Sequence, residues 1–320
     1  MSANKLHKFI FEGVPVRGAL VQLTDTWLEA LRRRAVVGEF PAPVRVLMGE
    51  MVAAGLLMQS SIKFEGALVL QLHGDGPVKL VVAEVKSTLS FRTTAKVVGP
   101  LDDAASLQQM VNPRGTGRCA ITLDPRERAP GAQPYQGVVS LHGDQREPLD
   151  SLAQVLEHYM LQSEQLDTRL ILAANDEVAA GLLLQRMPVS GAGNLADFRD
   201  EDRIGRDDDF NRIALLGATL TAQELLTLDA EQILHRLFWQ ERLRSFAPLP
   251  STFACTCSPE RVRGMLQGLG RTEIEDILTE REVVEVCCDF CGQQFHFDAV
   301  EVTRMFTPER DQPAAPPTLQ

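Results

Sequence analysis

The feature that most constrains this chain is a set of four cysteines near its C-terminal end, arranged as two close pairs. Cys255 and Cys257 form a Cys-x-Cys pair, and Cys288 and Cys291 form a Cys-x-x-Cys pair after thirty intervening residues. Four thiolates are a common ligand set of a tetrahedral structural zinc site. Gly292 follows the second pair and tolerates the backbone angles of a sharp metal-binding turn. The spacing therefore predicts a four-cysteine site that holds one zinc ion per chain.

Three alternatives remain open on the residues alone. Cys287 adjoins Cys288, and if it were the ligand the second pair would be Cys-x-x-x-Cys, a poorer match to a tight turn. We therefore favour Cys288. His296, five residues after Cys291, would be a fourth ligand only if one cysteine were spared. The third alternative is that these cysteines are free thiols that bind no metal, but unrelated cysteines would rarely fall into two such close pairs.

Length and composition indicate a folded protein of two or three domains. The chain has 320 residues, of which 44% are hydrophobic. It contains no run of 18 apolar residues, and its first residues have no apolar stretch of signal-peptide length. We therefore expect no membrane association and a cytoplasmic location. In a reducing compartment, paired cysteines indicate metal binding or redox activity more than permanent disulfides.

Charge and motif content exclude several classes of function. The net charge is −11, and residues 255–298 hold nine acidic and four basic residues, which argues against a zinc-dependent nucleic-acid binder. The six histidines are scattered, and no serine-hydrolase, zinc-protease or phosphate-loop motif occurs. We expect no catalytic residues. The alternative from another class is a thiol–disulfide oxidoreductase that uses Cys288 and Cys291. The second cysteine pair and the absence of a β-α-β pattern around the motif weigh against it.

Residues 1–188 have the pattern of an α+β domain that mixes sheets and helices. Residues 5–22 suggest an opening strand, Thr24 or Asp25 can begin a helix, and residues 44–56 place apolar side chains at helical spacing. Asp150 can cap a later helix. Cys119 falls in a predicted strand and is expected to be an inert core residue. The remaining predicted strands are 66–73, 78–86, 89–98, 117–123, 134–142, 168–174 and 178–187.

Residues 189–249 are predicted to form a charged and helical linker. Ten of the thirteen residues from Asp197 to Asp209 are charged, which is typical of a solvated segment. Thr221 and Glu224 form a capping-box pattern, and Asp229 can cap the next helix. That helix carries an apolar stripe over 233–238, which we expect to pack on the preceding domain.

Residues 250–306 are predicted to form a small zinc-binding domain. Ser258-Pro259 favours a helix start, Thr272 begins another short helix, and 283–286 and 295–297 suggest two strands around the second cysteine pair. Because this segment has few large apolar side chains, it cannot build an adequate core alone, and we expect bound metal to supply the missing stability. Residues 307–320 are rich in proline and are expected to be a disordered tail.

These cysteines, with stretches along nearly the whole chain, resemble the 33 kDa chaperonin family of redox-regulated bacterial holdase chaperones. The most specific part is the arrangement of Cys255, Cys257, Cys288, Cys291 and Gly292. The family's fold is an α+β domain, a helical linker and a zinc domain. Other similar stretches are Pro134-Tyr135-Gln136-Gly137-Val138-Val139, Tyr159 through Ser163-Glu164-Gln165, Gly181-Leu182-Leu183-Leu184-Gln185 before Met187-Pro188, and Glu224-Leu225-Leu226.

The resemblance implies a function that the spacing does not show. It implies an inactive reduced state in which zinc holds the four thiolates, and oxidation under heat or oxidative stress to the disulfides Cys255–Cys257 and Cys288–Cys291. Zinc would leave, the small domain would unfold, and a homodimer would capture unfolding client proteins without ATP. Cys287 and Cys119 depart from the family pattern, and Cys287 offers alternative disulfide partners. The client surface is not defined by the sequence; the 233–238 stripe and the 44–57 helix are candidates.

Overall fold

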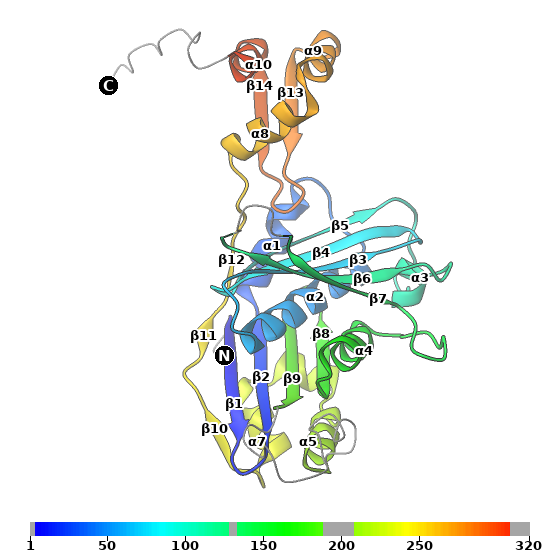
Figure 1. Cartoon of the computed structure of the whole chain (residues 1–320), viewed down its shortest axis with the longest axis vertical. Helices are drawn as coiled ribbons and strands as arrows, with labels where there is room; N and C mark the ends of the chain where they lie inside the picture. The colour runs from blue at the N-terminus through cyan, green and yellow to red at the C-terminus, as the bar shows by residue number, and fades with distance from the viewer. Residues whose placement is uncertain (1–3, 128–132, 188–207, 308–320) are drawn as a thin grey trace. The chain divides into compact units, whose positions relative to one another are not determined.

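The computed structural model describes residues 4–127, 133–187 and 208–307. The chain divides into two compact units, Met1–Ala254 and Cys255–Gln320. Both units combine strands with helices, which confirms the predicted α+β class (Figure 1). The charged run up to residue 207 and the expected disordered tail from residue 308 lie outside the described residues.

The N-terminal unit is built on two sheets (Figure 1). The first has the strand order β10-β1-β2-β9-β8, with β11 also paired to β1, and the second has the order β12-β5-β4-β3-β6-β7. All pairs are antiparallel except β12 with β5. The strands are β1 (Lys5–Phe11), β2 (Val16–Leu23), β3 (Gly66–His73), β4 (Val78–Lys86), β5 (Ser90–Val97), β6 (Arg118–Pro125), β7 (Tyr135–Ser140), β8 (Thr168–Ala174), β9 (Ala179–Arg186), β10 (Leu243–Ser245), β11 (Leu249–Pro250) and β12 (Thr252–Phe253).

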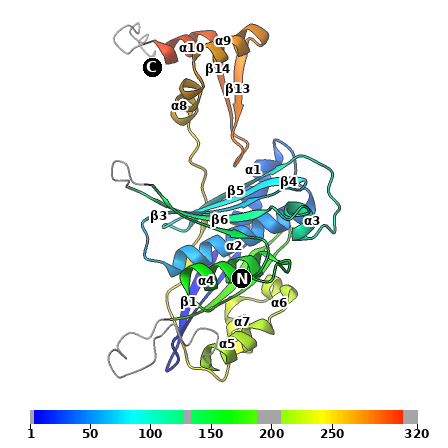
Figure 2. The same ribbon diagram turned by 45° about the vertical axis from the view of Figure 1, so that its right-hand side comes forward.

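The helix α2 (Ala42–Ser61) lies between the two sheets and contacts strands of both (Figures 1 and 2). Fourteen of its twenty residues are buried, as expected for a helix that is apolar on most sides. Two glycines permit close approach. A Cβ at Gly49 would lie 2.5 Å from Cβ of Ala174 in the first sheet, and one at Gly55 would lie 2.8 Å from a methyl of Val85 in the second. The other helices here are α1 (Asp25–Ala35), α3 (Leu107–Val111) and α4 (Leu152–Glu164).

Three helices form a second apolar core with the first sheet. They are α5 (Asp208–Ala218), α6 (Ala222–Thr227) and α7 (Ala230–Phe238). Capping boxes at Thr221 and Asp229 begin α6 and α7, as their sequence patterns predict. The α7 stripe packs against strands β1 and β2, where the Phe238 ring meets that of Phe11 edge to face at 5.0 Å. In this structure the two candidate client surfaces, the α7 stripe and α2, are therefore both buried.

The segment after α7 returns along the N-terminal unit as strands. Leu243–Ser245 and Leu249–Pro250 pair with β1, and Thr252–Phe253 pairs with β5. This pairing joins residues more than 150 positions apart in the sequence, so no local sequence pattern predicts it.

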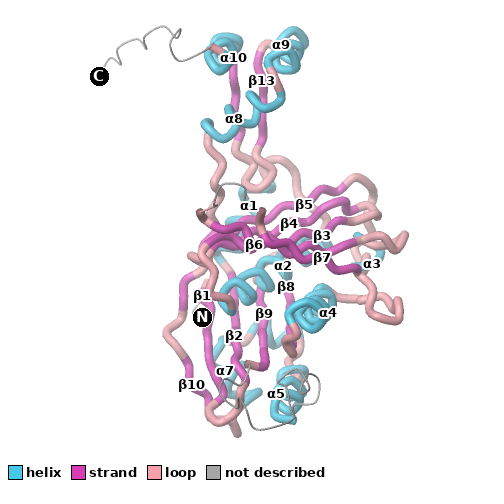
Figure 3. Tube along the Cα trace, in the orientation of Figure 1, coloured by secondary structure: helices cyan, strands magenta, loops and turns pink. Residues whose placement is uncertain are grey.

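The C-terminal unit has a small core of its own. Strands β13 (Val283–Cys287) and β14 (Gln294–Asp298) form a hairpin, accompanied by α8 (Pro259–Leu269), α9 (Arg271–Glu280) and α10 (Ala299–Phe306) (Figure 3). Eight buried apolar side chains form its core: Val262, Leu266, Ile274, Val284, Phe295, Phe297, Val302 and Met305.

Some local sequence predictions differ from the structure. The opening segment is two strands, β1 and β2, joined by a turn. The cap of α4 is Ser151, whose Oγ accepts a hydrogen bond from the Gln154 amide at 3.2 Å, so the assignment to Asp150 is wrong by one residue. Helix α9 begins after Gly270 and includes Thr272, because the chain reverses at this glycine with φ +97°. The sequence interpretation predicted none of the helices α3, α5 and α10.

Candidate metal centre

The first cysteine pair lies just before α8. One residue, Ala254, separates Cys255 from the end of strand β12, and Cys257 directly precedes Ser258. Ser258 caps the helix, because its Oγ accepts a hydrogen bond from the Arg261 amide at 3.3 Å, and Pro259 occupies the first turn. Cys257 is therefore held at the start of α8, directly before the residue that caps the helix.

The second cysteine pair occupies the turn between β13 and β14. The Cys288 amide donates to the Gln293 carbonyl at 2.9 Å, and the Gly292 amide donates to the Cys288 carbonyl at 2.8 Å. Gly292 has φ +70°, a value that disfavours a side chain at this position. The turn folds so that Cys288 and Cys291 share one side. This is the role that the sequence analysis predicts for the glycine.

The two turns bring four sulfur atoms together. The Sγ atoms of Cys255, Cys257, Cys288 and Cys291 all lie within 4.8 Å of one another. Two close contacts join one pair to the other: the Sγ atoms of Cys255 and Cys288 are 3.6 Å apart, and those of Cys257 and Cys291 are 3.4 Å apart. A disulfide would require about 2.05 Å, so these are thiols.

The sulfur cluster fits a tetrahedral zinc ion. Zinc–sulfur bonds of about 2.3 Å place the corners of a tetrahedron about 3.8 Å apart, close to the sulfur separations observed. Cys257 and Cys288 also pack against the apolar core of the C-terminal unit. An ion held here would therefore join both cysteine segments to that core.

The pKa values of the clustered thiols show that a cation would help them to ionise. Burial raises the pKa of Cys257, and hydrogen bonds to neighbouring thiols raise it further. Burial also raises the pKa of Cys291, to about 11. Burial works in the same direction on Cys255, but hydrogen bonds from the backbone amide and thiol of Cys257 outweigh it and lower its pKa. Without positive charge the cluster resists ionisation at several sulfurs at once, and a divalent ion removes that resistance.

The remaining candidate ligands lie outside the cluster. Cys287 is the last residue of β13 and pairs with Gln294, and its thiol makes a 3.9 Å contact to the Cys288 carbonyl. His296 lies on β14, about half exposed, with Nδ1 3.6 Å from Glu285. Cys119 is fully buried in β6, where burial raises its pKa to about 12, so its expected inert role is consistent with the structure.

The fold and the site define a class of protein: an α+β domain followed by a small module in which four cysteines converge. The family model described as "Hsp33 protein" matches residues 4–298. The chain belongs to this family, as the resemblance of its cysteine motifs and flanking stretches implies.

Relatives and a solved structure agree with this assignment. The chain is 43% identical over 303 residues to a 33 kDa chaperonin of Chromobacterium violaceum, covering 95% of this chain and 94% of the relative. It is 41% identical over 308 residues to one of Methylobacillus flagellatus, covering 96% of each. The crystal structure of the 33 kDa chaperonin of Thermotoga maritima matches with a TM-score of 0.72 at 19% identity, over 94% of this chain and 97% of that one.

The assignment supports a chaperone role, and the names of the relatives are consistent with a protein that is not an enzyme. Across the ranges that the structure describes, no helix has the length and apolar character needed to cross a membrane.

Proposed function

We propose that this protein is a redox-regulated chaperone that holds unfolding proteins without ATP, with the four-cysteine cluster as its switch. The observation that carries the proposal is the convergence of two cysteine pairs, from two separate turns, beside the core of a small module. In the reduced state, Cys255, Cys257, Cys288 and Cys291 would hold one zinc ion. The module would then be folded and the chaperone inactive.

Bound zinc supplies two things: charge that keeps the thiols ionised, and a cross-link between the two cysteine segments. Oxidation removes both. Within each pair, two thiols lose two protons and two electrons to peroxide or hypochlorite, and one sulfur–sulfur bond forms while the oxidant is reduced. The family resemblance favours the disulfides Cys255–Cys257 and Cys288–Cys291. The geometry does not single out these disulfides, because all four sulfurs lie within 4.8 Å of one another and close contacts also join Cys255 to Cys288 and Cys257 to Cys291.

Loss of the ligands would unfold the module, because eight buried side chains are a small core for a unit of this size. Structural zinc contributes about 10–16 kcal/mol in small domains, as much as the whole net stability of a typical domain, which is about 5–15 kcal/mol. Unfolding would then loosen the neighbouring segments and allow capture of clients by a homodimer in the cytoplasm. Reductant would reverse the change, since disulfides lie on the reversible part of the oxidation ladder.

The decisive experiment measures zinc and thiols on the same samples. The reduced protein should contain one zinc per chain and release it on treatment with peroxide at raised temperature. Four thiols should disappear together with the metal. Reduced protein without metal would remove the basis of the proposal.

Chaperone activity is tested by light scattering from a denatured client. Oxidised protein should suppress aggregation, and reduced zinc-loaded protein should not. Equal suppression by both forms would mean that the cysteines are not the switch. Buried Cys119 offers a matched control, because Cys119→Ala removes a thiol outside the cluster and should leave the switch intact.

A further inference from the structure

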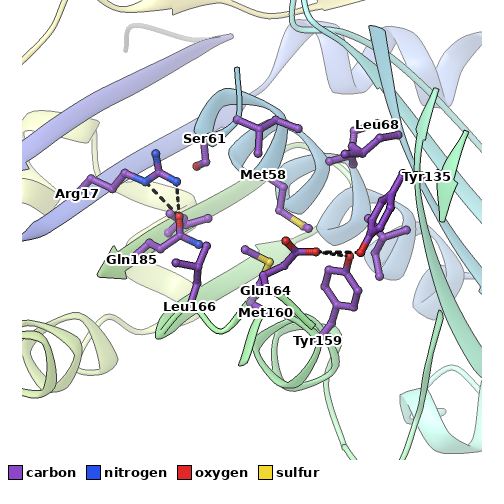
Figure 4. Close-up of a pocket in the computed structure, with 14 residues that line it drawn as sticks. Arg17, Met58, Ser61, Leu68, Tyr135, Tyr159, Met160, Glu164, Leu166 and Gln185 are labelled. Carbon is purple, nitrogen blue, oxygen red and sulfur yellow. Dashed lines mark hydrogen bonds between the residues drawn. The ribbon is translucent and has the colours of Figure 1, made fainter. Parts of the chain in front are cut away.

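A small cavity in the N-terminal unit has no part in the proposed redox switch. It measures about 90 Å³ and lies beside the C-terminal end of α2, between strands of the two sheets and α4 (Figure 4). Aliphatic side chains make up most of its wall: Met58, Ile62, Leu68, Ile121, Leu123, Met160, Leu166 and Leu183. Engineered apolar cavities of about 150 Å³ bind benzene, so a cavity of about 90 Å³ has room for an alkyl chain of about three carbons.

At one end of the cavity, a carboxylate already accepts hydrogen bonds from two protein side chains. The hydroxyls of Tyr159 and Tyr135, the only two tyrosines of the chain, both donate to Oε1 of Glu164, at 2.8 and 3.3 Å (Figure 4). Burial raises the pKa of Tyr159, and its bond to Tyr135 adds to this effect, so its hydroxyl stays a donor. This end therefore has little to offer an anionic ligand.

At the other end of the cavity, a cation is paired with a neutral side chain. Arg17 on β2 donates through Nε to Oε1 of Gln185 at 3.1 Å and through Nη2 to the same oxygen (Figure 4). Gln185 is fully buried and neutral, and its own amide donates to Thr168 at 2.9 Å. Among the described residues, no carboxylate forms an ion pair with Arg17 within 4.0 Å. A guanidinium has five N–H donors, so several remain available.

The charge around Arg17 is further unbalanced by Lys8 on the neighbouring strand β1. Burial lowers the pKa of Lys8, and repulsion from Arg17 lowers it further. Burial also lowers the pKa of Arg17. Lys8 donates to the Ser60 carbonyl at 2.7 Å, a neutral partner. Two partly desolvated cations thus stand together in a chain whose net charge is −11.

We propose that this cavity binds a small amphipathic carboxylate, with its alkyl chain among Met58, Leu68 and Leu183 and its carboxylate paired with Arg17. Arginine presents a planar fork that matches a carboxylate in two parallel hydrogen bonds. The apolar wall takes the chain, and Glu164 at the opposite end disfavours the reverse orientation. Site and ligand are therefore matched in both charge and polarity.

The test titrates butyrate into the reduced full-length protein labelled with ¹³C in the methionine methyl groups. The methyl signals of Met58 and Met160 should shift, and that of Met265, exposed in the C-terminal unit, should not. Butanol and butylamine are the matched probes. Because charged hydrogen bonds contribute about 1.5–3 kcal/mol, butyrate should bind about tenfold or more tightly than butanol. Shifts of all three signals alike, no shift, or tighter binding of butylamine would overturn the proposal.

Two variants act on the two halves of the site. Arg17→Gln should weaken butyrate binding about tenfold and leave butanol binding unchanged, because only the carboxylate uses the guanidinium. Leu68→Phe fills the cavity and should abolish the shifts from both ligands. Arg32→Gln, on the exposed surface of α1, is the control and should bind as the wild type does. Thermal unfolding confirms that each variant is folded; unchanged butyrate affinity in a folded Arg17→Gln or Leu68→Phe would refute the assignment.

Discussion

At the scale of single residues, Cys287 and Cys288 are neighbours with different surroundings. Cys288 belongs to the sulfur cluster and contacts Cys255, whereas Cys287 ends a strand outside it. Because side chains alternate along an extended chain, adjacent cysteines cannot both point to the same ion. The turn that follows β13 therefore decides which of the two is available.

This difference yields a direct prediction. Cys288→Ser should lower zinc affinity by at least about a hundredfold, because one of four ligands is lost. Cys287→Ser should change it less than about threefold. Competition with a chromogenic chelator under reducing conditions measures both. The reverse ranking would make Cys287 the ligand.

A partly buried acid in the N-terminal unit predicts a pH effect on stability. Burial raises the pKa of Glu50, on α2, to about 7. Asp103 and Asp150 line the same surface pocket, so further negative charge lies nearby. The folded state holds the Glu50 proton more tightly than the unfolded chain does, so this residue's contribution to the free energy of unfolding falls as pH rises from about 4.5 to 7.

Glu50→Gln removes this titration while keeping the size of the side chain. The variant should gain about 3 kcal/mol over the wild type near pH 8 and less than about 1 kcal/mol near pH 5, since the pKa is raised from 4.5 to about 7 and one pKa unit corresponds to about 1.4 kcal/mol. Urea unfolding followed through Trp27, which is fully buried in the same unit, gives the comparison. Glu12→Gln, at an exposed site, is the control. Equal gains at both pH values would show that Glu50 is not the titrating group.

At the scale of elements, the helices α5 to α7 are held by apolar packing on the first sheet. Ile233 of α7 is fully buried, whereas Leu215 of α5 is 71% exposed. Burial of large side chains is the main attachment of an amphipathic helix to a sheet, and each contributes about 1.5–3 kcal/mol. The capping boxes define where the helices begin but contribute less.

The packing predicts unequal costs for two truncations in this segment. Ile233→Ala should lower the free energy of unfolding by about 2–4 kcal/mol through lost burial and the cavity left behind. Leu215→Ala should change it by less than about 0.5 kcal/mol. Chemical denaturation of the reduced protein measures the free energy of unfolding of both variants. A cost at Leu215 as large as that at Ile233 would mean that the outer face of α5 is covered in solution.

At the scale of the whole molecule, the two units have separate apolar cores, and only the C-terminal one contains the cysteine cluster. The core around α2 is far larger than the core of the C-terminal unit. Stability in such a chain need not be uniform, and one unit can open while the other remains folded.

Removal of metal should therefore act on one unit alone. A strong chelator added to reduced protein should abolish hydrogen-exchange protection at Ile274, Val284 and Phe297, while the amides of α2 keep theirs. Added zinc should restore the lost protection. The same chelator should change nothing further in Cys288→Ser. Retained protection in the C-terminal hairpin, or loss in α2, would contradict a local role for the metal.

The sequence alone determined whatever depends on close neighbours along the chain. The two cysteine pairs with Gly292, the capping boxes at Thr221 and Asp229, and the alternation of the central strands all express short-range chemistry. Together they sufficed to predict the α+β class, most strands and the convergence of four cysteines. Boundaries shifted by a residue or so, as at Ser151, because several polar residues in succession can each cap a helix.

The tertiary structure decided what depends on residues far apart. The placement of α2 between two sheets, the return of residues 243–253 as strands beside β1 and β5, and the burial of the α7 stripe all arise from long-range contacts. The same holds for Arg17 and Glu164 at two ends of one cavity. No local pattern encodes such pairs, because their proximity follows from packing that minimises exposed apolar area over the whole unit.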